Sequence, residues 1–303
     1  MTHAGRTECM AAQRARGQGA WAAPLAVLAL SSLGGCSTPA PPPAAAPPLA
    51  APAPPEPPAP PSTTGVAAAP AAPGATAVPA SVEPAPPAPP APSPCPEGMA
   101  LISGGDYVFG PTKEKVTVKP FCLDVNEVTV GAYATCVNAG KCDKSFVTVC
   151  DPITYGKDGT EKLPMACVDF KQAETYCAAQ GARLPSAEEW EWAARGGAEA
   201  RKRPWGDGDL GDQLCWLGKE KRTGPCAVGS FPAGNNPQGV HDLLGNVGEW
   251  TTSRSDATSS IRYARGGSWK DSAKELFRVD RPGVFKATYR CGFVGIRCAK
   301  PAP

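Results

Sequence analysis

The sequence predicts an exported domain with little regular secondary structure, preceded by a signal segment and a long linker. Eleven of the 13 cysteines lie after residue 94, and the helix signals in that part of the chain are short. From Gly197 onward, Gly, Pro, Asn and Asp are too frequent for long helices or strands. Such a fold depends on buried aromatic side chains, local turns and disulfides, with bound ions as a further source of stability.

Residues 1–36 have the features of an export signal. Three arginines precede an apolar run over residues 21–33, which is too short to span a bilayer. The run ends in Leu-Gly-Gly followed by Cys36, an order typical of a bacterial lipobox. We therefore expect Cys36 to be lipidated and to anchor the chain to a membrane of the cell envelope; the alternative is an ordinary cleaved signal with an incidental cysteine. Ser37, which is not an aspartate, favours the outer membrane, on its periplasmic face or at the cell surface.

Residues 37–94 consist almost entirely of Pro and Ala, with charges only at Glu56 and Glu83. So little bulky apolar surface cannot offset the entropy of ordering the backbone, and we expect a disordered linker. In the polyproline II conformation, at about 3.1 Å per residue, its maximum reach is on the order of 170 Å. The linker would hold a domain spanning residues 95–303 well away from the membrane.

The charge of the chain argues against a nucleic-acid partner. The formal net charge is only +2, whereas nucleic-acid-binding domains carry a clustered basic surface.

The cysteines of the domain are dispersed, which in an exported protein indicates a disulfide framework. A metal cage is disfavoured because no Cys-x-x-Cys occurs and His3 and His241 are the only histidines. Short loops make Cys136 with Cys142, and Cys215 with Cys226, candidate pairs.

Capping signals predict three short helices. The N-cap residues are Thr129, Asp169 and Ser186, and the helices end at Gly140, at Gly181 and before Gly196. Asp169 with Gln172, and Ser186 with Glu189, have the spacing of a capping box.

Four motifs follow one another through the domain. They are Arg-Leu-Pro-Ser-Ala-Glu-Glu-Trp-Glu at residues 183–191, Gly-Asn-Val-Gly-Glu-Trp at 245–250, Arg-Gly-Gly-Ser-Trp at 265–269 and Gly-Ile-Arg-Cys at 295–298. In order and spacing this set resembles the formylglycine-generating enzyme family, also called the sulfatase-modifying factor domain. The resemblance implies an α+β fold, related to the C-type lectin fold and poor in regular secondary structure.

The same resemblance exposes a difference in chemistry. Oxidase members of the family carry two copper-binding cysteines shortly after the Gly-Gly-Ser-aromatic turn, and residues 270–276 here contain none. Asp271 offers hard oxygen and Leu276 offers no ligand, so neither suits copper(I) and copper is not expected. An iron-dependent branch uses three histidines, which His241 alone cannot supply. We expect no catalytic residues.

In oxidase members the active groove begins at the Gly-Gly-Ser-aromatic turn. The resemblance therefore implies that Ser268 and Trp269 lie in a groove. Gly248, which replaces a common tryptophan of the family, would reshape the floor of that groove. A single Cys291 cannot replace the missing pair.

A structural calcium ion is also implied by the resemblance. Its ligands would be the side chain of Asp242, the main-chain oxygens of Gly245 and Val247, and Glu249. Oxygen-rich ligand sets of this kind suit calcium. The alternative is that Asp242 and Glu249 cap turns, or pair with Arg265 and Arg297, without a metal.

Family members link a cysteine in the helix before the Arg-Leu-Pro motif to the cysteine that ends the last motif. The resemblance thus implies a disulfide between Cys177 and Cys298. The remaining cysteines then share two bonds, so that one thiol stays unpaired or bonds to another molecule; they are Cys95, Cys122, Cys150, Cys167 and Cys291.

Two functions remain open. The first is a noncatalytic domain on a membrane anchor that binds a peptide, a glycan or another envelope protein. The alternative is an enzyme, either a copper-dependent formylglycine-generating oxidase with relocated thiols or another activity that uses the same groove.

Overall fold

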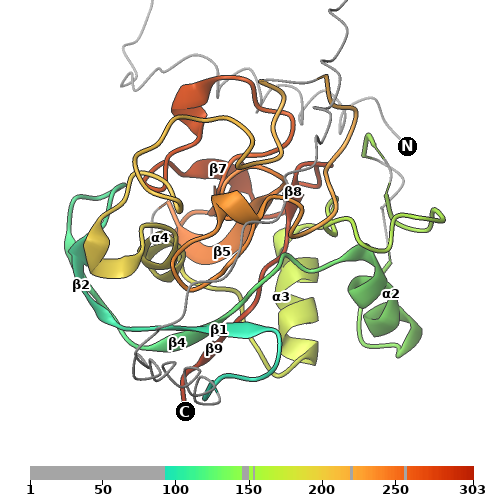
Figure 1. The fold of residues 1–303 in the computed structure, drawn as a ribbon. Helices are drawn as coiled ribbons and strands as arrows, with labels where there is room; N and C mark the ends of the chain where they lie inside the picture. Colours follow the sequence, from blue (N-terminus) through green and yellow to red (C-terminus); the bar gives the residue numbers. More distant parts are fainter. Residues whose placement is uncertain (1–92, 145–149, 153, 219–220, 256–257) are drawn as a thin grey trace, which may run out of the picture. The chain divides into compact units, whose positions relative to one another are not determined.

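The computed structural model describes residues 93–144, 150–152, 154–218, 221–255 and 258–303. Cys36 and residues 37–92 of the predicted linker lie outside these residues. The described residues belong to one compact unit, drawn in colour in Figure 1. Among them, no helix has the length and apolar character needed to cross a membrane.

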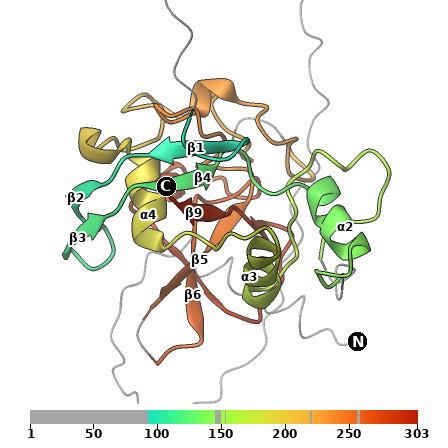
Figure 2. The ribbon, with the colours of Figure 1, turned by 90° about the horizontal axis from the view of Figure 1, so that it is seen from below.

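The first and last strands of the domain meet in one antiparallel sheet. Its three strands are β1 (Met99–Ile102), β4 (Phe121–Asp124) and β9 (Ala299–Pro301), with β4 in the middle. Leu123 of β4 pairs with Ala100 on one side and with Ala299 on the other. The carboxyl-terminal strand therefore closes the domain beside its beginning (Figure 2).

A separate antiparallel hairpin joins β2 (Gly105–Val108) to β3 (Lys115–Val118). Tyr107 points into the domain, where its ring lies 5.3 Å from that of Trp192. In the turn, Lys113 has a φ of +62°, a left-handed conformation that a lysine rarely adopts.

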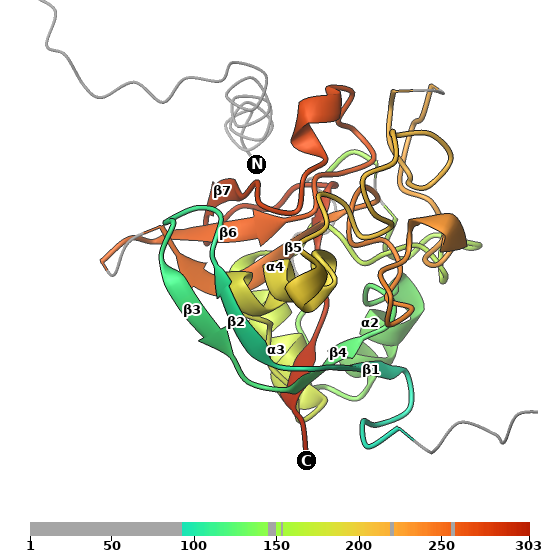
Figure 3. The ribbon, with the colours of Figure 1, turned by 60° about the vertical axis from the view of Figure 1, so that its left-hand side comes forward.

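The third sheet brings three of the sequence motifs together. It contains β7 (Gly283–Lys286), β6 (Ile261–Arg265), β5 (Gly248–Arg254) and β8 (Val294–Gly295), in that order. Glu249 of β5 pairs with Arg265 of β6 on one side and, in parallel, with Gly295 of β8 on the other. Motif residues far apart in the sequence thus become neighbours in space (Figure 3).

The predicted helix starts are confirmed. The α-helices are α2 (Val130–Asn138), α3 (Phe170–Ala179) and α4 (Ala187–Ala194). The hydroxyl of Thr129 accepts from the amide of Ala132, and both predicted capping boxes are formed. The described residues also contain three single-turn 3-10 helices: η2 (Gly197–Glu199), η3 (Pro232–Gly234) and η4 (Lys274–Leu276).

Aromatic side chains fill the core, as the sequence predicted. Trp190 and Trp250 are fully buried at the centres of two apolar clusters. Trp192, Trp216 and Trp269 are no more than 4% exposed.

Disulfides tie the loops to this core. The structure confirms the two short-loop pairs predicted above, and it also contains the disulfide between Cys177 and Cys298. Two further bonds among the described residues join Cys95 to Cys122 and Cys150 to Cys167. Cys291 is buried beside this last bond, and its carbonyl accepts a hydrogen bond of 3.0 Å from the Cys167 amide.

The disulfide between Cys177 and Cys298 closes a loop with a sequence separation of 121 residues. In the loop-entropy model, such a closure stabilises the fold by about 4–5 kcal/mol. We expect peptide mapping without reductant to recover the two cysteines in one linked peptide, and Cys177→Ala with Cys298→Ala to lower the urea midpoint. Recovery of either cysteine as a free thiol would contradict the assignment.

Candidate functional site

The motifs converge on a buried ion pair between Glu249 and Arg297. Glu249 Oε1 accepts from Nε of Arg297 at 2.9 Å and from Nη2 at 2.7 Å. Glu249 Oε2 accepts from the indole N–H of Trp190 at 2.6 Å. All three residues are completely buried, so these motif residues build the interior of the domain.

Backbone carbonyls satisfy the rest of the Arg297 guanidinium. Nη1 donates to the carbonyls of Asp124 (2.9 Å) and Val125 (3.0 Å), and Nη2 donates to that of His241 (2.7 Å). Every N–H of this side chain therefore has an acceptor, which a buried charge requires. Arg297 joins β4, the loop before residue 245 and β5.

A second buried pair joins Arg265 to Glu191, with a distance of 2.6 Å between Nη2 and Oε2. The guanidinium lies over the ring of Trp190 at 5.2 Å, and Glu191 Oε1 accepts from the amide of Gly110 at 2.9 Å. The pairing of Glu249 with Arg297, which the alternative to calcium predicted, is thus observed. The expectation that Arg265 pairs with Asp242 or Glu249 is wrong, because the partner of Arg265 is Glu191.

Glu127 belongs to the same network and was missed by the sequence analysis. It is 1% exposed; Oε2 accepts from the side-chain amide of Asn246 at 2.5 Å, and Oε1 from the backbone amide of Val247 at 3.1 Å. Asn246 has a φ of +46°, which asparagine tolerates better than most residues. The sequence signal was weak, because Glu127 lies outside the four motifs and beside other polar residues, Asp124 and Asn126.

Burial makes this network electrostatically unusual. It raises the pKa of Glu127 well above its ordinary value, and the nearby Asp242 and Glu249 add to the effect. Burial also raises the pKa values of Asp242 and Glu249. For Arg297 burial acts against the charged form, yet Glu249, with Glu127 and Asp242, holds its pKa above the ordinary value. The guanidinium therefore stays charged among several acids.

The predicted calcium ligands lie together, but their acceptors are partly used. Asp242 Oδ2 accepts from the amide of Gly229 at 2.7 Å. Glu249 uses three of its about four lone pairs on Arg297 and Trp190, so it has at most one for a metal. Within the described ranges, no three Asp, Glu, His or Cys residues form a group that could hold a metal ion. The side chains present fit the guanidinium better than calcium, and ion binding stays a prediction.

Gly245 has a steric role that needs no metal. Its φ is +85°, and a Cβ atom there would lie 2.6 Å from the carbonyl oxygen of Cys215. A larger residue would displace the backbone at this turn.

Ser268 and Trp269 do not line an open groove. They are only 1% and 4% exposed; the Ser268 hydroxyl donates to Asp271 Oδ2 (2.9 Å) and the Trp269 indole donates to the carbonyl of Gly292 (3.0 Å). Gly248 is likewise buried. These expectations from the resemblance are corrected: the residues after the turn pack into the interior.

The segment after this turn carries a carboxylate and an apolar residue. Asp271 is 5% exposed and hydrogen-bonded to Ser268, and Leu276 ends the 3-10 helix η4.

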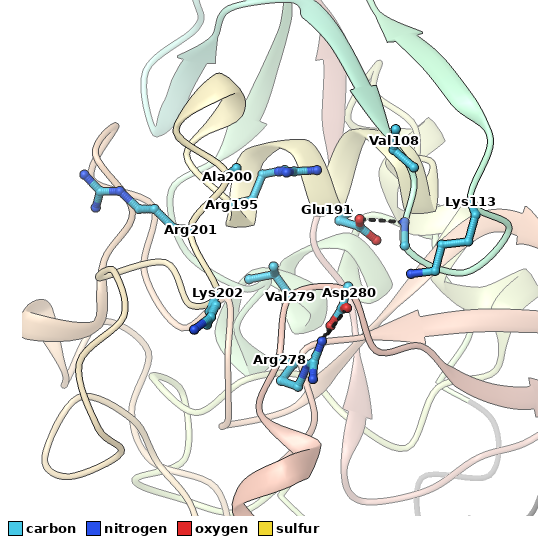
Figure 4. A pocket seen from close by; sticks show the side chains of 11 residues that line it. Val108, Lys113, Glu191, Arg195, Ala200, Arg201, Lys202, Arg278, Val279 and Asp280 are labelled. Carbon is cyan, nitrogen blue, oxygen red and sulfur yellow. Dashed lines mark hydrogen bonds and ion pairs between the residues drawn. The ribbon is translucent and has the colours of Figure 1, made fainter.

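An open pocket of about 180 Å³ lies apart from these residues, beyond the carboxyl end of α4 (Figure 4).

Comparison with known families identifies the fold. Residues 85–302 match the family described as "Sulfatase-modifying factor enzyme 1-like domain", which covers most of the chain. The chain belongs to this family.

Relatives within or near this family carry different names. The chain is 41% identical over 122 residues to "Inactive C-alpha-formylglycine-generating enzyme 2" of Mus musculus, covering 37% of this chain and 39% of that protein. It is 32% identical over 152 residues to "Hercynine oxygenase" of Mycolicibacterium smegmatis, covering 42% of this chain and 33% of that protein. The matched segments span well under half of these relatives.

Solved structures confirm the α+β formylglycine-generating-enzyme fold. PvdO from Pseudomonas aeruginosa aligns with a TM-score of 0.57 and 22% identity, covering 69% of this chain and 95% of that chain. CarF aligns with the same TM-score and 19% identity, covering 68% and 98%. At such identities the likeness shows the fold alone.

The Glu249→Gln variant tests the ion pair and the calcium prediction together. It keeps the size of the side chain but leaves Arg297 buried without its counter-charge, so we expect urea denaturation to show a loss of about 3–5 kcal/mol in the free energy of unfolding. The exposed Glu275→Gln serves as the control.

If calcium also binds, chelation lowers the melting temperature of the wild type by linkage, and this response is weaker in Glu249→Gln. A wild-type melting temperature that chelator leaves unchanged would reject the calcium site and leave the ion pair alone.

Proposed function

We propose that this protein is an envelope lipoprotein whose domain binds a peptide, a glycan or a protein partner without catalysing a reaction. One observation carries the proposal. Where oxidase members of the family place two copper-binding cysteines, this chain has Asp271 and Leu276. A carboxylate and an alkyl group do not form the soft ligand pair that copper(I) requires.

The packing of the turn supports the same conclusion. Asp271 is buried and already bonded to Ser268, so it has little freedom to take part in chemistry. Residues of the shared motifs, among them Glu191, Glu249 and Arg297, stabilise the interior. The motifs therefore account for the fold, and none of these residues needs a catalytic role.

A binding role suits the architecture. Long loops surround a disulfide-bonded frame, and loops held by a rigid scaffold are common binding surfaces. A relative named as inactive is consistent with this role, although fold alone does not establish function.

The enzyme alternative is favoured by the likeness to hercynine oxygenase. A three-histidine iron site would need more than His241, the one histidine of the domain. An activity built on other residues of this fold remains the alternative to noncatalytic binding.

An activity assay separates noncatalytic binding from the formylglycine-generating oxidase alternative. The protein is incubated with copper(I), oxygen, reductant and a Cys-x-Pro-x-Arg peptide, the substrate motif of the oxidase members. We expect no stoichiometric copper(I) binding, no loss of thiol mass and no aldehyde, because the thiolate pair is missing. The double variant Asp271→Cys with Leu276→Cys is the matched control, and it should gain copper(I) binding. Aldehyde formation by the wild type above a heat-killed control would overturn the noncatalytic proposal.

Membrane anchoring is tested at Cys36. The proposal requires lipid on this residue, so wild-type protein should partition into detergent and fractionate with membranes. Cys36→Ala should lose both properties, because no acyl chains can be attached, while Cys9→Ala should keep them. Unchanged fractionation of Cys36→Ala would contradict the anchor.

A further inference from the structure

The pocket beyond α4 has more basic than acidic side chains in its lining. Its walls come from the β2–β3 turn, from residues 195–202 and from residues 278–280. Five of the lining residues are basic and two are acidic. The basic residues are Lys113, Arg195, Arg201, Lys202 and Arg278.

Both acids of the pocket already have partners. Glu191 is bonded to Arg265 and to the amide of Gly110. Asp280 accepts from Arg278 at 2.9 Å and 2.7 Å. Burial opposes ionisation of Asp280, yet Arg278, with Lys113 nearby, holds its pKa below the ordinary value. The pocket therefore has a positive potential that its own acids do not neutralise.

Arg201 is also neutralised, since its Nη2 lies 2.6 Å from Glu199 Oε2. In Figure 4 its side chain points away from the pocket, whereas Arg195 and Lys113 extend toward the space beside Glu191 from opposite sides. In the described part of the chain, no carboxylate lies within ion-pair distance of Arg195, Lys113 or Lys202. Three positive charges thus remain for a ligand.

The pocket is largely preformed. The Arg195 guanidinium lies over the ring of Tyr107 at 4.9 Å, which holds its plane while leaving its edge available. The Arg201 amide donates to the carbonyl of Arg195 at 2.9 Å, and the Val279 amide donates to that of Lys202 at 3.3 Å. These bonds fix the walls relative to one another.

The backbone at the rim is strained, which often accompanies binding. Lys113 and Ala200 both have left-handed backbone conformations, with φ values of +62° and +56°. Such conformations cost about 1–3 kcal/mol each and persist where the surroundings impose them, often at ligand sites.

Charge and size together define the ligand. A carboxylate would neutralise one of the three remaining positive charges, whereas a phosphate monoester carries a charge of about −1.5 to −2 at pH 7 and three acceptor oxygens. A cavity of about 180 Å³ far exceeds the space of about 10–15 Å³ that a single water molecule needs on the same measure, so it has room for one tetrahedral oxyanion and its linking atoms. A guanidinium fork suits such oxygens.

We propose that Arg195, Lys113 and Lys202 bind a phosphate group in this pocket, either as free phosphate or as the terminal phosphate of a lipid headgroup. This inference goes beyond the proposed function, whose ligand is a peptide, a glycan or a protein, and adds a separate phosphate site to the same domain.

The test uses the full-length chain carrying Cys36→Ala, so that no lipid anchor contributes to vesicle binding. Calorimetric titration at low salt and pH 7.5 should show saturable binding of inorganic phosphate and at least tenfold weaker binding of acetate. Arg195→Gln and Lys113→Gln should each weaken phosphate binding at least tenfold. Lys286→Gln, which removes the same charge from the exposed edge strand β7, should change it less than twofold.

Vesicles distinguish the two sources. If the ligand is a headgroup, phosphatidic acid in phosphatidylcholine vesicles should bind the protein with at least tenfold higher affinity than inorganic phosphate. Arg195→Gln should remove that gain in affinity. If the ligand is free phosphate, the vesicles should give no gain over inorganic phosphate.

The phosphate site would be overturned by a lack of saturable phosphate binding, or by equal binding to the wild type and to both pocket variants. Lys113 lies on an exposed turn, so its variant keeps the test valid if Arg195→Gln does not fold. Failure here leaves the noncatalytic proposal intact, because only aldehyde formation in the copper assay overturns that proposal.

Discussion

One buried guanidinium organises much of this domain. Arg297 reaches the carboxylate of Glu249 on the adjacent strand and, through its remaining N–H groups, three backbone carbonyls from two other segments. A charge in such a place requires partners on every side, because an unpaired buried ion costs several kcal/mol. The requirement restricts how the central sheet, the loop before Gly245 and β4 can pack.

This constraint changes the meaning of the sequence motifs. Glutamates and arginines in short Gly-rich motifs commonly suggest metal ligands or catalytic groups. Here Glu191 and Glu249 each hold an arginine in the interior, and Trp190 lies beside both pairs. A domain of this kind can thus keep its motifs and its fold with no thiolate pair near the Gly-Gly-Ser turn.

Local features of the fold were predictable from the sequence, whereas long-range ones were not. Capping at Thr129, Asp169 and Ser186 depends on residues within one helical turn, so sequence spacing was enough to place the helix starts. The pairing of Arg265 with Glu191 joins residues 74 positions apart, and no local pattern indicates it. The groove prediction failed for the same reason, since Trp269 is buried in a cluster with residues distant in the sequence, and its indole N–H donates to the carbonyl of Gly292.

The disulfide between Cys95 and Cys122 has a mechanical consequence. A pulling force transmitted along the preceding chain would enter the domain at Cys95 and pass covalently to Cys122 in β4, the middle strand of its sheet. The hydrogen bonds between β1 and β4 would then lie outside the path of the load. Unfolding under tension would have to remove β4 from between its two neighbours, β1 and β9. The disulfide therefore transmits the force past β1 to β4, the strand that is hydrogen-bonded on both sides.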